Sequence, residues 1–473
     1  MKNNFLYNYI GKVLIGLSMI FVFPEIVALI YNESVIPFFI PQLICLIFGL
    51  PIIALLGKKE DSVNTKFGIK TVAILWIIVS VVGALPLTIN NDATYINALF
   101  ETVSGFTTTG ATIFKNVETL NKSILFWRSL TNFIGGMGIL ALVIAIIPLS
   151  KSNKSMEDFK TDLPGPNAFK RLSGIKKTFI YLFGIYFFLT ILETVLLQCG
   201  GLKLFDSLLI SMGTAGTGGF SVLNSSLESY PIFCKYVVAI FMFLFGINFN
   251  IYLLICIKDF KRVLKSEELC AYIFIFIIST IILYINTLPI IKDTKQTVLQ
   301  SVFNVSSLIT GTGYRIGSIN EFYTTSRVVC LILMLIGGCV GSTCGGIKIS
   351  RMLISIKSIK RNLIKKFQPN IDDSVKFDGE KLSEETVKGT NTFILIYLLL
   401  ILLLVFIVAH DKYSLEITIN AVVSTISNVG LCFDITDFAN FSNFSKLVLS
   451  FGMLCGRLEL FPVISLFVND KNE

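Results

Sequence analysis

Long apolar runs with few charges are the feature that most constrains how this chain can fold. Five of them are close to the roughly 20 residues that a helix needs to cross about 30 Å of hydrocarbon. They lie at 5–30, 71–89, 123–149, 179–197 and 393–409. Hydrophobic residues make up 53% of the chain and charged residues only 15%, which excludes a water-soluble globule. The sequence therefore predicts an all-α integral membrane protein embedded in the lipid bilayer, with its first helix retained.

Four short, polar runs each lie between two apolar segments and each carry a glycine. They read Thr-Thr-Thr-Gly-Ala-Thr at 107–112, Gly-Thr-Gly-Gly-Phe-Ser at 216–221, Thr-Gly-Thr-Gly-Tyr at 310–314 and Ser-Asn-Val-Gly-Leu-Cys at 427–432. Their glycines, Gly110, Gly219, Gly313 and Gly430, are 109, 94 and 117 residues apart. Each run follows an apolar segment and a short amphipathic one, and precedes another apolar segment. This recurring order indicates an internal repeat.

The repeat predicts how the chain is divided. A two-helix extension at 1–67 precedes four units at 68–171, 172–266, 267–387 and 388–473. In each unit we expect a helix, a re-entrant hairpin and a second helix, with half-helices at 95–106, 204–215, 297–309 and 415–426. The expected fold is two N-terminal helices plus four tandem helix, pore-loop, helix repeats around a central pseudo-fourfold ion pore.

Irregular backbone at membrane depth needs a reason, because lipid offers it no hydrogen bonds. Such backbone is tolerated where it is buried in protein or lines a water-filled cavity. Glycine reaches positive φ without strain, and four such turns around one axis can direct carbonyl oxygens at a dehydrated cation. The competing interpretation, glycines as helix-packing notches, fits any one run but explains the set less well.

The net charge of +9 does not indicate a nucleic-acid partner, because the placement of the basic residues follows the orientation of the chain in the membrane. Basic residues gather in four segments between apolar runs, at 58–70, 151–177, 258–265 and 351–388. We expect these segments and the N-terminus to be cytoplasmic. The ten cysteines form no CxxC pair, and His410 stands alone beside Asp411, so neither a metal site nor enzymatic chemistry is indicated.

The motifs resemble those of the Trk/Ktr/HKT superfamily of potassium transporters over essentially the whole chain, and its TrkH branch in particular. The runs at 102–112 and 216–221 look like the first and second filter loops, and 312–314 and 429–431 are similar to the third and fourth. The two helices before the first repeat and the Asp-Leu-Pro-Gly-Pro run at 162–166 favour the TrkH branch.

The resemblance implies potassium permeation through one chain, a homodimer in the bacterial cytoplasmic (inner) membrane, and control by a cytosolic nucleotide-binding ring of the TrkA type. Nucleotide would be bound only by that partner, and potassium is the substrate rather than a cofactor. The filter residues carry over to Thr108, Thr109, Gly110, Gly218, Gly219, Thr312, Gly313, Val429 and Gly430. In plant relatives a glycine at the first position goes with potassium preference, so Gly110 argues for potassium over sodium.

A glycine-rich run in the third repeat predicts a break in its second helix. Residues 337–346 read Gly-Gly-Cys-Val-Gly-Ser-Thr-Cys-Gly-Gly, and each glycine costs a helix about 1 kcal/mol relative to alanine. The family has its intramembrane gating loop at this place, which implies a gating role for Gly341, Ser342, Thr343, Cys344, Gly345, Gly346 and Lys348. Cys344 stands where we expect glycine, and Lys348 and Arg351 are expected to face the cytoplasmic mouth. The competing interpretation is a small-residue helix crossing.

Arg457 is expected near the middle of the last apolar helix. A charge at that depth is costly against lipid, so it should face the bundle interior or a wet cavity. A pore-facing arginine below the filter would repel cations, whereas pairing with Glu459 would make it structural. Similar arginines occur at this place in the family.

The sequence leaves the energetics open. A proton- or sodium-coupled symporter could use the same pore, since a carbonyl filter has no obligatory proton carrier. Glu101 and Asp206 lie on the half-helices and could either contribute to the field near the filter or orient the hairpins. No phosphate-binding glycine motif occurs in the chain, so any nucleotide control must come from a partner.

Overall fold

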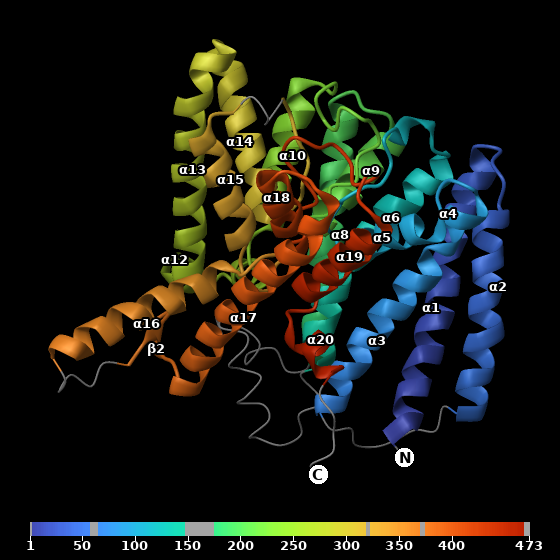
Figure 1. Cartoon of the computed structure of the whole chain (residues 1–473), viewed down its shortest axis with the longest axis horizontal. Helices are drawn as coiled ribbons and strands as arrows, with labels where there is room; N and C mark the ends of the chain where they lie inside the picture. Colours follow the sequence, from blue (N-terminus) through green and yellow to red (C-terminus); the bar gives the residue numbers. More distant parts are fainter. Residues whose placement is uncertain (1, 57–64, 147–174, 318–321, 369–373, 468–473) are drawn as a thin grey trace.

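The computed structural model describes residues 2–56, 65–146, 175–317, 322–368 and 374–467. These residues form an almost wholly helical bundle (Figure 1). In the described part, six helices are long and apolar enough to cross a membrane, and one further bent pair brings the number to seven. The all-α membrane fold predicted from the apolar runs is confirmed. The run at 162–166 and the basic segment around 151–171 lie outside the described residues.

The N-terminal extension is a helical pair at one flank of the bundle (Figure 1). It consists of α1 (Lys2–Ile30), α2 (Ile36–Pro51) and a short π-helical turn, η1 (Ile52–Leu56). Glycines at the crossing let the two helices approach closely. A Cβ added at Gly11 would lie only 3.0 Å from the Gly49 carbonyl oxygen.

In each of the first two repeats a long helix comes first, and a short helix, the glycine run and a further helical segment follow it. The first contains α3 (Thr65–Gly83), α4 (Leu85–Ile89), α5 (Tyr95–Phe106), η2 (Val117–Thr119) and α6 (Lys122–Ile146). The second contains α8 (Ile175–Cys199), α9 (Leu204–Gly216), α10 (Ile232–Phe245), α11 (Phe249–Cys256) and α12 (Phe260–Lys265). The chain bends by 89° between α10 and α11, so the helix that follows the glycine run in this repeat is broken in two. This break was not predicted from the sequence, although Gly246 and Asn248 interrupt the apolar run there.

The third and fourth repeats follow the same plan. The third contains α13 (Glu267–Ile291), α14 (Thr294–Thr310), α15 (Thr324–Ile336), α16 (Ile349–Phe367) and a small hairpin, β1 (Lys376–Phe377) and β2 (Glu380–Lys381). The fourth contains α17 (Glu384–Val408), η6 (Ala409–Asp411), α18 (Leu415–Ile426), α19 (Asn443–Arg457) and α20 (Phe461–Ser465). The expected break after 336 is present. α14 begins three residues earlier than expected, because Asp293 caps it by accepting from the Lys295 amide at 2.9 Å.

The four short helices α5, α9, α14 and α18 occupy equivalent places in the repeats. Each packs against a helix from the repeat before it: α9 against α6, α14 against α10, α18 against α15, and α5 against α19. Because the last repeat contacts the first in this way, the four units close around a common axis. The short helices thus point into the centre of the bundle, where the glycine runs follow them.

Candidate functional site: a ring of four glycine loops

The four glycine runs share one backbone hydrogen-bond pattern. In each run, the amide of the residue before the glycine donates to a carbonyl oxygen five residues earlier, near the end of the short helix. The pairs are Thr109 to Ser104 at 2.8 Å, and Gly218 to Gly213, Thr312 to Ser307 and Val429 to Ser424, each at 2.9 Å. The loops therefore turn their amides back to the helices in the same way, and their carbonyl groups point elsewhere.

The glycines bring the loops into contact in a cyclic order. A Cβ added at Gly110 would overlap the carbonyl oxygen of Gly218, and the same holds for Gly219 with Thr312, Gly313 with Val429, and Gly430 with Thr109. All four glycines have φ between +58° and +78°, a region that side chains disfavour. Both the conformation and the close approach require glycine. The contacts run from the first loop through the fourth and back, so the loops form a closed ring.

The carbonyl oxygens at these contacts have no donor. In the described part of the chain, none of the carbonyl oxygens of Thr109, Gly218, Thr312 and Val429 accepts a hydrogen bond. Thr109 and Thr312 are 0% exposed and Val429 is 1% exposed. Buried carbonyl groups are nearly always paired, so four unpaired ones in a ring need another partner. A dehydrated cation is a chemically suitable one.

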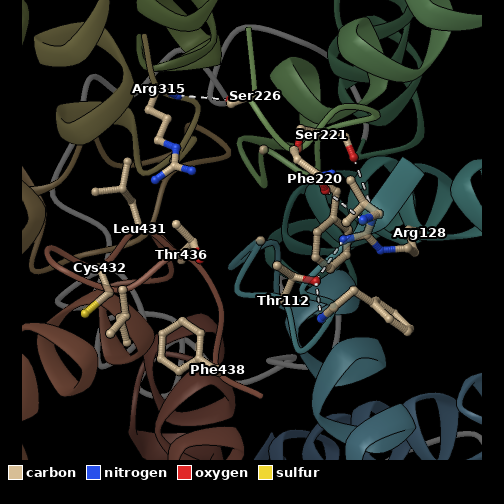
Figure 2. Close-up of a pocket in the computed structure, with 18 of the residues that line it drawn as sticks. Thr112, Arg128, Phe220, Ser221, Ser226, Arg315, Leu431, Cys432, Thr436 and Phe438 are labelled. Carbon is tan, nitrogen blue, oxygen red and sulfur yellow. Dashed lines mark hydrogen bonds between the residues drawn. The ribbon is translucent and has the colours of Figure 1, made fainter. Parts of the chain in front are cut away.

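A cavity of about 310 Å³ lies on one side of the ring. All four ring glycines line it, together with the segments that follow them, including Thr112, Phe220 and Leu431. Figure 2 shows these segments entering the cavity from different repeats. At about 30 Å³ per molecule, the volume holds roughly ten waters, which is enough room for a hydrated ion.

The loop between α15 and α16 lies on the opposite side of the ring. The Thr217 hydroxyl donates to the Thr343 carbonyl oxygen at 2.8 Å. A Cβ added at Gly345 would overlap the carbonyl oxygen of Ser427, at the start of the fourth run. The predicted gating residues are therefore in direct contact with the second and fourth loops of the ring.

The same loop is fixed to the surrounding helices. The carboxylate of Glu268 accepts from the Val340 amide at 2.7 Å, and the Phe249 amide donates to the Gly341 carbonyl oxygen at 3.1 Å. Lys348 is 5% exposed and its ammonium group donates to the Cys344 carbonyl oxygen. The loop thus has an ordered backbone with specific anchors. Glu268 and Phe249 are among these anchors, and no motif in the sequence indicated them.

Arg457 joins three repeats beneath the ring. Its guanidinium donates to the Thr343 carbonyl oxygen at 2.6 Å and to the Gly135 carbonyl oxygen at 2.8 Å. The residue is 1% exposed. The expected place in the middle of a helix is wrong: α19 ends at Arg457, because Glu459 and Leu460 adopt positive φ and break the segment. The guanidinium nevertheless faces the bundle interior.

The sequence of this chain also matches that of a known protein family over most of its length. The sequence model of TrkH, described as a cation transport protein, matches residues 37–473. The chain belongs to the TrkH family.

Relatives match the TrkH-family chain over nearly its whole length. It is 31% identical to the Trk system potassium uptake protein TrkG of Escherichia coli (strain K12), covering 94% of this chain and 93% of the relative. It is 32% identical to a protein of Methanocaldococcus jannaschii named uncharacterized cation transporter MJ1485, over 94% and 91% of the two chains. The crystal structure of the potassium transporter TrkH from Vibrio parahaemolyticus has a TM-score of 0.90, with 25% identity and 99% coverage of both chains. The TrkH family consists of cation transporters and not of enzymes.

One expectation about the region below the ring needs correction in this TrkH-family chain. Lys348 and Arg351 were expected to face the cytoplasmic mouth, but both are buried, with 5% and 4% of their surface exposed, and Arg351 pairs with Glu459 at 2.6 Å. The guanidinium also lies over the Phe393 ring, 4.1 Å from its centroid. Glu459 therefore has Arg351 as its partner, and the suggested pairing of Arg457 with Glu459 is not what the structure shows.

Sequence reasoning missed the partner of Glu101. Arg128 Nε donates to the Glu101 carboxylate at 2.7 Å, and these side chains are only 3% and 1% exposed. The second oxygen of Glu101 accepts from the Ile113 amide at 2.8 Å, just after the first glycine run. Arg128 also donates to Thr112 and to the Ser221 carbonyl oxygen, at 3.2 and 3.4 Å (Figure 2). The pair links α5 and α6 to the segments that follow the first two glycine runs, which supports the orienting role suggested for Glu101.

Proposed function

We propose that this chain takes up potassium through the ring of glycine loops. The observation that carries the proposal is the cyclic closure of four loops whose buried carbonyl oxygens lack donors. The ligands would be carbonyl oxygens from Thr109, Gly110, Gly218, Gly219, Thr312, Gly313, Val429 and Gly430, with Thr108 contributing to the first loop. Two relatives are named potassium uptake proteins, which supports potassium as the substrate.

Cation preference would follow from the first loop. Gly110 has a φ of +75° and leaves no room for a side chain against Gly218. A ring held at this separation presents oxygens at a fixed distance, which favours one ion size over another. The four loops differ in sequence, so the ring has only approximate fourfold symmetry.

Gating would come from the loop beneath the ring and from Arg457. The loop, with Gly341, Ser342, Thr343, Cys344, Gly345, Gly346 and Lys348, would lie on the path of an ion leaving the ring. Its contacts with Thr217 and with the start of the fourth run would hold it across the path. The guanidinium of Arg457 adds a positive charge at the same place. Movement of the loop would then release both barriers together.

Regulation and assembly remain part of the proposal. We infer a homodimer in the bacterial cytoplasmic membrane, with the N-terminus on the cytoplasmic side, controlled by a TrkA-type nucleotide-binding ring. The relatives' names refer to a Trk system, which supports further subunits. The basic helix α16 projects from the lower half of the bundle, where α1 begins (Figure 1), and basic residues favour the cytoplasmic side.

Ion uptake by the purified protein tests the central proposal. Proteoliposomes would be given radioactive potassium or radioactive sodium outside, with and without the partner ring and nucleotide, and the label taken up would be counted. We expect potassium to enter faster than sodium, and the partner to change the rate. Equal entry of both ions would contradict the filter assignment, while an unchanged rate with the partner would remove only the regulatory part.

One observation favours the alternative, a coupled symporter. Glu193 on α8 is 0% exposed, and neither carboxylate oxygen makes a hydrogen bond with a described residue. The neighbouring Thr214 hydroxyl donates instead to the Ile210 carbonyl oxygen at 2.9 Å. A buried carboxyl of this kind could carry a proton. Potassium uptake that requires a proton gradient, and loses that requirement in Glu193→Gln, would establish coupling.

A further inference from the structure

The cavity outside the ring has an unexpected charge for the entrance of a cation pathway. Its charged lining residues are Lys115, Arg128 and Arg315, and among the described residues no aspartate or glutamate lines it. Cation pathways usually concentrate their ion with acidic residues. Here the described walls carry only positive charges.

Two of the three charges are either paired or exposed to solvent. Arg128 is neutralised by its buried pair with Glu101. Lys115 is exposed, so water and salt screen its charge. Neither side chain leaves an isolated charge inside the cavity.

Arg315 places an unpaired positive charge inside the cavity. Its guanidinium makes no hydrogen bond or ion pair with any described residue, and it extends into the cavity (Figure 2). Its backbone is fixed, because the Arg315 amide donates to the Ser226 hydroxyl at 3.2 Å. The preceding Tyr314 is 0% exposed and its hydroxyl lies 3.3 Å from the carbonyl oxygens of Ile210 and Phe220. The charge is therefore held two residues after Gly313, at the entrance to the ring.

We infer that Arg315 is a specificity-determining residue that excludes divalent cations from the ring. The local concentration of an ion falls exponentially with its charge multiplied by the potential it meets. If Arg315 lowers the potassium concentration at the ring by some factor, it lowers that of a divalent cation by the square of this factor. Arg315 thus lowers the potassium concentration at the ring moderately and the concentration of divalent cations by a larger factor. This inference rests on the proposed uptake function.

The expected size of the effect is moderate because the cavity holds water. One charge about 10 Å from the ion, in water but partly enclosed by protein, changes the local concentration of a monovalent ion about two- to fivefold. The corresponding change for a divalent ion is about four- to 25-fold. Both effects shrink as salt shortens the screening length from about 30 Å at 0.01 M to about 3 Å at 1 M.

Barium added outside the cells is the probe, because it is a divalent cation whose access to the ring can be measured as inhibition of potassium uptake. Potassium uptake would be measured in cells that lack their own uptake systems and express the full chain, at low ionic strength and again in high choline chloride. We expect Arg315→Gln to raise uptake at low potassium about two- to fivefold and to strengthen barium inhibition by about the square of that factor. Arg315→Lys, which keeps the charge, should resemble the wild type. Lys203→Gln, an exposed lysine that does not line the cavity, is the matched control.

Three results would overturn the inference. Arg315→Gln could leave barium inhibition unchanged, it could change potassium uptake and barium inhibition by the same factor, or its effect could persist undiminished in high salt. Each would show that the charge does not set the divalent barrier. If the wild-type chain itself brings in no potassium, the proposed function fails instead, so the two failures are distinguishable.

Discussion

Arg457 donates to the carbonyl oxygen of Thr343 at 2.6 Å, which joins the broken last helix of the fourth repeat to the loop beneath the ring. The same guanidinium reaches Gly135 on α6 at 2.8 Å. A positive charge below the ring and the position of the loop are therefore linked through one side chain. A change that moves the loop must also break a charge-assisted hydrogen bond.

Replacing Arg457 should open the pathway. Arg457→Ala removes both the charge that repels cations and the bond that holds Thr343, so we expect potassium flux to rise about tenfold or more. Arg457→Lys keeps the charge but loses the forked geometry, and should give an intermediate flux. Flux into proteoliposomes measures both variants. An unchanged flux in Arg457→Ala, with the protein still folded, would assign the residue a structural role.

Deleting residues 341–345 should produce a leak that ignores the cytosolic partner. The deletion removes the Thr343 carbonyl oxygen, which is the acceptor for both Thr217 and Arg457. Cys344→Ala is the matched control, because it leaves the loop length and these backbone acceptors intact. Flux would be compared with and without partner and nucleotide. Control retained by the deletion variant would place the gate elsewhere.

A side chain at Gly110 should widen the ring. Gly110→Ser puts a Cβ against the Gly218 carbonyl oxygen and keeps a φ of +75°, which costs of order 1–3 kcal/mol of strain. The ratio of potassium to sodium flux is expected to fall, by about tenfold if the strain is relieved by moving the loops apart. Gly184→Ser is the control, since nothing lies within 4 Å of a Cβ added there. An unchanged flux ratio in Gly110→Ser would count against this loop as the selective one.

The sequence predicted the spans and two of the short helices because these elements depend on local signals. An apolar run predicts a span, and a glycine after a half-length helix predicts a turn, so α5 and α18 begin and end where expected. The break between α10 and α11 was missed because Gly246 and Asn248 lie in an otherwise apolar run. Helix-packing glycines in membranes look the same.

The pairings between repeats could not be predicted in the same way. Arg351 and Glu459 are 108 residues apart and meet only because the third and fourth repeats pack together. The same is true of the contact of Arg128 with the Ser221 carbonyl oxygen, which depends on how α6 faces the second loop. Such partners follow from packing and leave no spacing in the sequence.

The Glu101 and Arg128 pair should control the geometry of the first loop. Glu101→Gln leaves Arg128 as a buried, uncompensated charge, so we expect the free energy of unfolding to fall by about 3 kcal/mol. The potassium-to-sodium flux ratio should fall with it, because the Ile113 amide loses a charged acceptor. Thermal unfolding in detergent and flux ratios in proteoliposomes measure the two effects.

A neutral residue in the third repeat suggests how to separate the effect of the Glu101 and Arg128 charges from the effect of their hydrogen bonds in the first repeat. Asn304 lies at the place in α14 that Glu101 has in α5, eight residues before the threonine of each filter run. It holds Ile316 without an ion pair, its amide group donating to the Ile316 carbonyl oxygen at 3.2 Å. The double variant Glu101→Asn, Arg128→Met copies this neutral arrangement and removes the unpaired charge. Stability should therefore recover to within about 1 kcal/mol, because both charges are absent together. Recovery of stability without recovery of the flux ratio would show that the link from Arg128 to the Ser221 carbonyl oxygen, and not the charge balance, fixes the spacing of the first two loops.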